Sequence, residues 1–210
     1  MFLKELVLTN FKNIHLEHLE FKSKFNIFFG NNAQGKTNTL ESIHVLSNYK
    51  TFHNQKNKDV IQCNENKATI YAAISSKNIE KQCGIEILPH SKKIFLNHKE
   101  VNNVLSYLEM IPSISFIPND HLIIKGDPEY RRRFLDRSVF SVNPEFGEKL
   151  SLFKKILFQR NQLLKNMSNS SMNDTFLSWN EMFISAAVEV EFERIQFIKR
   201  LFPYVKESFS

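Results

Sequence analysis

The fold class of this chain is decided by one stretch, Phe25-Asn26-Ile27-Phe28-Phe29-Gly30-Asn31-Asn32-Ala33-Gln34-Gly35-Lys36-Thr37. It fits the P-loop pattern G-x-x-x-x-G-K-[ST], in which a glycine-rich loop joins a strand to a helix. The apolar run Phe25–Phe29 predicts a buried strand before the loop. Residues 38–46 predict the helix after it, with an apolar face formed by Leu40, Ile43 and Leu46. Strand, loop and helix in this order predict an α/β fold that binds a nucleotide phosphate.

Each residue type in this loop suits phosphate chemistry. Successive backbone N–H groups can surround a phosphate, and the start of the following helix adds partial positive charge. Glycine allows backbone angles that a Cβ would block. Lys36 would reach the β- and γ-phosphates, and the Thr37 hydroxyl would ligate Mg²⁺. ATP or GTP with Mg²⁺ is therefore expected at Gly30, Asn31, Asn32, Ala33, Gln34, Gly35, Lys36 and Thr37, and no catalytic residue is assigned.

Composition and charge indicate a globular protein with a basic surface. The net charge is +6, and the stretch Asp120–Lys165 holds ten Lys/Arg against six Asp/Glu. This excess favours a polyanionic partner, although a solvated surface is the alternative. Cys63 and Cys83 stand alone, as in proteins of a reducing compartment. The N-terminus has no signal-peptide pattern and no run reaches membrane-span length, so a cytoplasmic protein without a membrane partner is expected.

Several segments in the first half of the chain are strand-like, and one of them, Ile14–Phe21, mixes apolar and polar residues as a half-buried strand does. They are Leu3–Thr9, Ile14–Phe21, Ala68–Ile74, Gln82–Leu88 and Lys93–Leu96. The last three predict a meander, so an antiparallel layer is expected beside the P-loop strand. A short helix is predicted at Val101–Glu109, and a second buried strand at Ser113–Asp120. Pro118 argues against Asp120 as a Walker B carboxylate, because proline interrupts the ladder before the acid.

The second half of the chain reads as helical. Asp127 as N-cap and Pro128 at the first helical position predict a helix start, and Asn143-Pro144 predicts its end. Two long amphipathic helices follow, Phe146–Lys165 and Thr175–Pro203, joined by a Ser/Asn-rich loop at Met167–Asp174. The expected domains are therefore residues 1–125, which carry the P-loop, and residues 126–210, which form a helical lobe.

A basic triplet, Arg131-Arg132-Arg133, is the predicted DNA contact. Consecutive residues fan around a helix, so only part of the triplet can face one phosphate backbone. Salt bridges to Asp127, Glu129 or Asp136 are the alternative that the charge pattern alone favours.

Four blocks of the sequence resemble the RecF family of bacterial DNA replication and repair ATPases. They are Leu3–Asn13, Gly30–Asn38, Ile117–Asp136 and Gln159–Lys165. The resemblance implies the ABC-type ATPase head of SMC proteins, with a helical lobe inserted in it. It also implies an ATP-dependent homodimer on DNA that supports recombinase loading at gaps, with RecO and RecR as partners, in the SOS response to DNA damage.

The sequence departs from that family in two respects. Asn119 stands where the family usually has an acid, at the place where related heads carry a nucleotide-sensing glutamine. A Leu-Ser-x-Gly-Gln-like signature helix and an apolar strand ending in Asp are not found, and the resemblance places both beyond Ser210. The chain is therefore expected to be the N-terminal part of such a protein and not to hydrolyse ATP by itself. The alternatives are a small P-loop kinase or a module that holds nucleotide or DNA without turnover.

Overall fold

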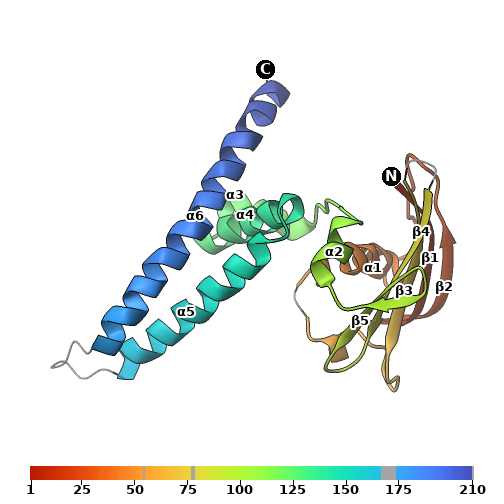
Figure 1. Cartoon of the computed structure of the whole chain (residues 1–210). Coiled ribbons are helices and arrows are strands. Elements are labelled where there is room, and N and C mark those ends of the chain that lie inside the picture. The colour runs from red at the N-terminus through yellow and green to blue at the C-terminus, as the bar shows by residue number, and fades with distance from the viewer. Residues whose placement is uncertain (54, 77–78, 167–173, 210) are drawn as a thin grey trace. The chain divides into compact units, whose positions relative to one another are not determined.

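The computed structural model describes residues 1–53, 55–76, 79–166 and 174–209. Within them the chain forms two compact units, Met1–Ile117 and Pro118–Ser210 (Figure 1). The sequence placed this division between residues 125 and 126. The difference arises because two short helices, η2 (Pro118–His121) and α3 (Leu122–Lys125), pack with α4 (Pro128–Val142) of the second unit.

The first unit is built on an antiparallel sheet of six strands in the order β2-β1-β3-β4-β5-β6. The strands are β1 (Phe2–Phe11), β2 (Ile14–Glu20), β3 (Ala68–Ser76), β4 (Ile79–Ile87), β5 (Lys92–Leu96) and β6 (Lys99–Val101). The predicted meander and the first two strands are thus confirmed. The last hairpin turns at Asn97 and His98, whose φ angles of 47° and 65° match the positive φ that a tight two-residue turn requires.

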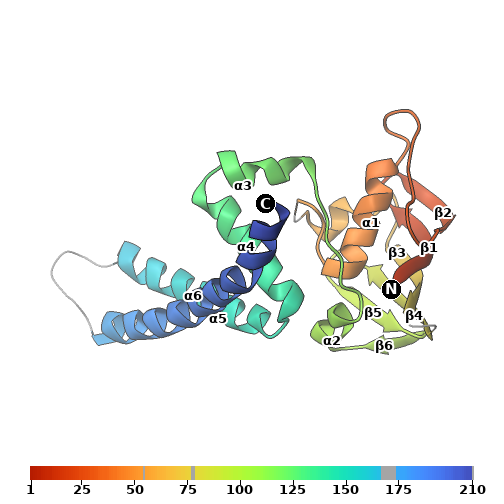
Figure 2. The same ribbon diagram turned by 90° about the horizontal axis from the view of Figure 1, so that it is seen from above.

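The core of this unit lies on one face of the sheet. The ladder places Leu8 beside Ile70, Ile70 beside Ile85 and Ile85 beside Ile94, and all four side chains are buried. Side chains alternate between the two faces of a strand, so this register gathers the apolar residues on one side. Helix α1 (Lys36–Asn48) lies against the sheet and contacts β1 and β4 (Figures 1 and 2).

The predicted helix after the P-loop is confirmed as α1, but its buried face differs from the prediction. Leu46 is buried, whereas Leu40 is 48% exposed. The face turned to the sheet instead carries Val45 and Leu46 together with polar residues such as Ser42. The Ser42 hydroxyl donates to the Thr39 carbonyl at 2.7 Å, and this local bond lets a polar residue occupy a buried helical position.

The two apolar segments predicted as buried strands, Phe25–Phe29 and Ser113–Asp120, are not strands. The exposed fractions are 88%, 83% and 90% for Phe25, Ile27 and Phe29, and 99% and 89% for Ile114 and Phe116. An apolar run becomes a strand only when a neighbour supplies backbone partners, and neither segment joins the six-stranded ladder among the described residues. In the second segment, Ser113 and Ser115 hydrogen-bond to polar side chains of α1.

The second unit is helical. The long helices α5 (Phe146–Asn166) and α6 (Asp174–Ser208) run antiparallel side by side (Figures 1 and 2). The core lies where α4 meets them and contains Val139, Phe146 and Val190, with Phe140, Leu150, Phe153 and Phe197 packed around it. The predicted helices are confirmed. The predicted loop lies outside the described residues except for Asp174, which begins α6. No helix in the described ranges is long and apolar enough to cross a membrane.

A buried ion pair joins α4 to α6. Arg194 Nη2 lies 2.7 Å from Asp136 Oδ1, and the two side chains are only 8% and 13% exposed. The same guanidinium also contacts Glu191 at 2.5 Å, but that carboxylate is 60% exposed. The pair brings together residues far apart in the sequence and fixes the α4–α6 contact next to the apolar core.

Candidate nucleotide-binding site

The loop that precedes α1 contains three residues at positive φ. Gly30, Ala33 and Gly35 have φ angles of 139°, 65° and 89°. Left-handed residues interspersed in a loop turn successive N–H groups toward one concavity, where they can surround an anion. At Gly35 a Cβ would also lie 3.3 Å from Ile14 Cγ1, so close packing adds to the conformational reason for glycine.

Lys36 folds back over this loop. Its ammonium donates to the Gly30 carbonyl at 2.9 Å and to the Asn31 carbonyl at 2.5 Å. These bonds hold the positive charge at the mouth of the loop, where a phosphate oxygen can take up the remaining donor capacity of the ammonium. Lys36, which the P-loop pattern indicated as the phosphate-binding lysine, therefore lies against the loop.

Thr37 lies in the first turn of α1 and is exposed. The helix begins with a bond from the Thr39 N–H to the Gly35 carbonyl at 2.8 Å, so the loop passes directly into the helix. An exposed hydroxyl at this place suits Mg²⁺, which prefers oxygen ligands and usually keeps several waters and substrate phosphates. Within the described ranges there is no group of three or more His, Cys, Asp or Glu that could hold a metal by itself.

A polar side chain of the β1–β2 turn supports the loop from outside. Asn13 Nδ2 donates to the Ala33 carbonyl at 2.9 Å, and Asn13 Oδ1 accepts from Asn38 Nδ2 at 2.7 Å. Asn13 thus ties the loop to the first turn of α1. The sequence showed only a turn at this position, because nothing local in the residues 10–13 indicates a contact with residues 33 and 38.

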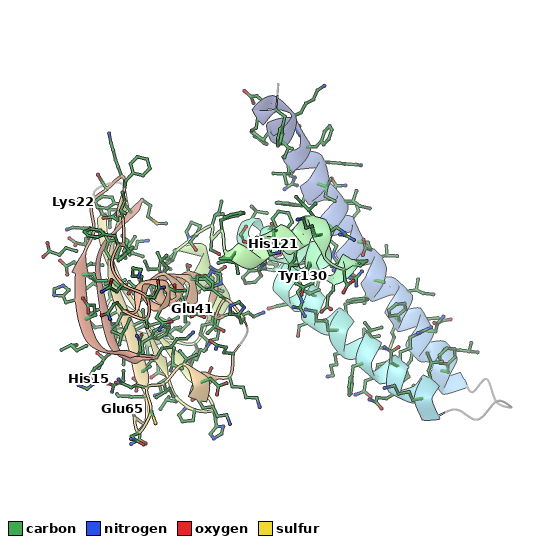
Figure 3. The ribbon with its side chains drawn as sticks, turned by 180° about the vertical axis from the view of Figure 1, so that it is seen from behind. His15, Lys22, Glu41, Glu65, His121 and Tyr130 are labelled. Atoms are coloured by element: carbon green, nitrogen blue, oxygen red, sulfur yellow. The ribbon has the colours of Figure 1, made fainter. Side chains whose placement is uncertain are left out.

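Glu41, one turn further along α1, provides a second contact between this helix and the β1–β2 turn. Its side chain is 3% exposed and forms an ion pair with Lys12 of the same β1–β2 turn. Its other oxygen accepts from the Phe52 N–H at 3.1 Å. Figure 3 shows Glu41 on α1, within the first unit, whereas His15 near the start of β2 and Lys22 just beyond its end lie on the periphery. Glu41 carries no motif that marks it in the sequence.

The predicted DNA contact, Arg131-Arg132-Arg133, lies on α4 in the second unit, near Tyr130 in Figure 3. Arg131 donates to the Gly126 carbonyl at 3.0 Å, and Arg133 pairs with Glu129 at 2.5 Å. In the described part of the chain, Arg132 forms no hydrogen bond or ion pair. Two arginines of the triplet are therefore held by nearby residues, whereas the third, Arg132, is exposed.

Asp120 lies in η2 and not at the end of a strand. Its carboxylate accepts from Arg137 Nη2 at 3.4 Å, so it is tied to α4 of the second unit. The structure does not bring Asp120 together with the P-loop in one unit.

Comparison with known proteins identifies relatives of the chain. Residues 2–116 match the family described as the RecF/RecN/SMC N terminal domain. The chain is 36% and 34% identical over 203 residues to the proteins named "DNA replication and repair protein RecF" of Bacillus velezensis and Bacillus subtilis. In both cases the match covers 96% of this chain and 55% of the relative, so the chain spans about half the length of the relatives it matches.

Two solved structures are also similar to this chain. They are described as the recombination mediator protein RecF-ATPrS and RecF-ATP in the RecFOR pathway. The TM-scores are 0.87 and 0.84 at 27% identity, over 95% of this chain and 55% and 54% of those chains.

Proposed function

The chain belongs to the RecF/RecN/SMC N-terminal domain family, and from this we propose that it binds ATP and serves DNA replication and repair. The observation that carries the proposal is the loop Gly30–Thr37, with three residues at positive φ and the Lys36 ammonium folded over them. The names of the similar structures, RecF-ATPrS and RecF-ATP, favour ATP over GTP.

The residues of this chain would divide the binding of the triphosphate among them. Backbone N–H groups of the loop and the start of α1 would hold the phosphates, and Lys36 would neutralise part of the charge. The Thr37 hydroxyl would hold one coordination position of Mg²⁺. A metal held there would supply positive charge that offsets part of the phosphate charge.

Substitution of Lys36 tests the proposal. Lys36→Ala should weaken the binding of a fluorescent ATP analogue in Mg²⁺ by roughly tenfold or more, because a charge-assisted hydrogen bond is lost. Lys24→Ala removes an equal charge from the exposed segment just before the loop, and its affinity should match that of the unmodified chain. Equal affinities for the unmodified chain and Lys36→Ala would contradict the proposed site.

We further propose that the second unit contacts DNA through charge alone, with Arg132 as one contact. Its support is the outward position of Arg132 and the excess of basic residues in Asp120–Lys165. Binding to random duplexes should weaken steeply as salt rises, because condensed counterions are released. The logarithm of the binding constant falls linearly with the logarithm of the salt concentration, and Arg132→Ala should reduce the steepness of this line by about 1. Arg133→Ala removes a residue that is paired with Glu129, so it should change the steepness less. A flat salt dependence would contradict a charge-based contact.

The partners proposed for the chain follow from its relatives. We propose an ATP-dependent homodimer that acts in the cytoplasm with RecO and RecR to support recombinase loading at gapped DNA. The support for RecO and RecR as partners is the description of the similar structures as a recombination mediator of the RecFOR pathway. Sedimentation velocity with and without ATP tests the homodimer, and a sedimentation coefficient that nucleotide does not change would contradict it.

We also propose that the 210-residue chain binds ATP without hydrolysing it. Hydrolysis needs a group that positions the attacking water, and the buried acid of α1 and the acid of η2 in the second unit are both engaged elsewhere. Glu41 is bound to Lys12 and to the Phe52 N–H, and Asp120 is bound to Arg137. Phosphate release by the purified chain, measured beside Lys36→Ala, tests this. Release that Lys36→Ala abolishes would show that a carboxylate of this chain completes the site.

A further inference from the structure

We propose that Asn13 is a positioning residue for phosphate binding, because it holds Ala33 in the left-handed conformation that the loop requires. The inference rests on the proposed nucleotide site and adds a residue from outside the P-loop pattern. Asn13 lies in the turn between β1 and β2, more than fifteen positions before the loop residue that it contacts.

Ala33 is an unfavourable residue for its position. Its φ of 65° places an L-residue with a Cβ in a region that glycine enters freely and alanine does not. Such a conformation persists only when the surroundings impose it. Neighbouring Gly30 and Gly35 have no such penalty, so Ala33 is the point at which the loop needs external support.

Asn13 supplies that support through the Ala33 carbonyl. The hydrogen bond from Asn13 Nδ2 measures 2.9 Å and fixes the direction in which this carbonyl points. In a trans peptide the C=O and the following N–H point in opposite directions. Holding the Ala33 carbonyl toward the β1–β2 turn therefore directs the Gln34 N–H away from the turn, which leaves it available to an anion.

The position of Asn13 is itself fixed independently of the loop. Lys12, its neighbour, donates its N–H to the Val60 carbonyl at 2.8 Å and its ammonium to buried Glu41. Asn38 donates to Asn13 Oδ1 at 2.7 Å, which orients the amide so that its NH₂ group faces Ala33. The β1–β2 turn is thus bound to α1 and to Val60. Asn13 of this turn in turn holds the loop through the Ala33 carbonyl.

A double-mutant cycle between Asn13 and Ala33 tests the inference. Asn13→Ala should weaken binding of the fluorescent ATP analogue roughly fivefold, as expected for one lost hydrogen bond. In the Ala33→Gly background, Asn13→Ala should reduce the affinity for the analogue much less, because glycine adopts the left-handed conformation without support. A merely structural asparagine would give equal losses in both backgrounds, and that result would overturn the inference.

A matched control separates loop support from general stability. Asn57 makes the same kind of bond within the first unit, since Asn57 Nδ2 donates to the Leu88 carbonyl at 2.9 Å, away from the loop. Asn57→Ala should leave nucleotide affinity unchanged. An equal loss of affinity in Asn57→Ala and Asn13→Ala would count against a specific role.

A measurement without nucleotide distinguishes failure of this inference from failure of the proposed site. Hydrogen exchange of the amides in residues 30–37 of the ligand-free chain should be faster in Asn13→Ala than in the unmodified chain, and Ala33→Gly should reduce the difference. If the unmodified chain shows no Lys36-dependent nucleotide binding, the proposed function fails, yet the exchange result still tests Asn13. Unchanged exchange would overturn the inference.

Discussion

Removing Asp136 should destabilise the second unit more than any single exposed charge can. Arg194 and Asp136 are 8% and 13% exposed, so the pair is largely shielded from water. Deleting one partner of a buried pair leaves an uncompensated charge and typically costs about 3–5 kcal/mol. Arg194 retains Glu191, which is 60% exposed and screened by solvent. We therefore expect Asp136→Ala to lower the free energy of unfolding by about 3 kcal/mol.

The sequence provides a probe specific to this unit. Trp179, which lies in α6, is the only tryptophan of the chain, so its fluorescence reports on the helical unit during urea unfolding. With a urea dependence of about 2 kcal/mol per molar for a small domain, the loss corresponds to a midpoint about 1.5 M lower. Circular dichroism followed in parallel would show whether the helical signal is lost in the same transition.

The second carboxylate on the same guanidinium is the matched control. Glu191→Ala removes an exposed partner of Arg194 and should cost no more than about 1 kcal/mol. Replacing both charges, as in Asp136→Ala with Arg194→Met, should cost less than Asp136→Ala alone, because no buried charge is left unpaired. Equal midpoint shifts for Asp136→Ala and Glu191→Ala would refute the reasoning from burial.

Three further outcomes follow from other parts of the structure. Burial raises the pKa of the Cys83 thiol to about 12, so a thiol reagent at neutral pH should modify only the other, exposed cysteine until denaturant is added. Gly84→Ala should lower the thermal midpoint, because the new Cβ would lie 2.3 Å from Tyr71 Cδ1, and Tyr71→Ala should reverse part of the loss. The hydrogen bond from Lys149 holds the pKa of Glu193 below its ordinary value. Its stabilisation is therefore present above about pH 4.3 and lost as the pH falls, so the stability difference between the unmodified chain and Lys149→Met should shrink from pH 6 to pH 3; a constant difference would contradict it.

Elements whose signal is local were predicted well from the sequence. The segments Ala68–Ile74 and Gln82–Leu88 were predicted as strands, and they lie in β3 and, apart from Leu88, in β4. Helix α4 begins at Pro128 and ends just before the predicted stop Asn143-Pro144. Proline restricts its own φ angle and the residue before it, so its effect on a helix boundary is local. The P-loop pattern likewise predicted its own positive φ angles at Gly30 and Gly35.

Features that depend on distant residues were not predictable in this way. Phe25–Phe29 is apolar enough for a buried strand, but strand formation needs a partner ladder that composition does not reveal. The bond between Asn13 and Ala33 and the ion pair between Asp136 and Arg194 each join positions that only the fold brings together.

The exposed segment Phe25–Phe29 has a consequence for the behaviour of the 210-residue chain in solution. It contains three side chains that are more than four-fifths exposed, and it has no charged residue and no proline to discourage pairing. Short apolar segments of this kind, when they lack a backbone partner, act as templates for other chains. Two copies that meet along this segment would satisfy each other's backbone and cover the phenylalanines. Self-association of the chain should therefore rise with its concentration, and charged gatekeeper substitutions at Ile27 should suppress it.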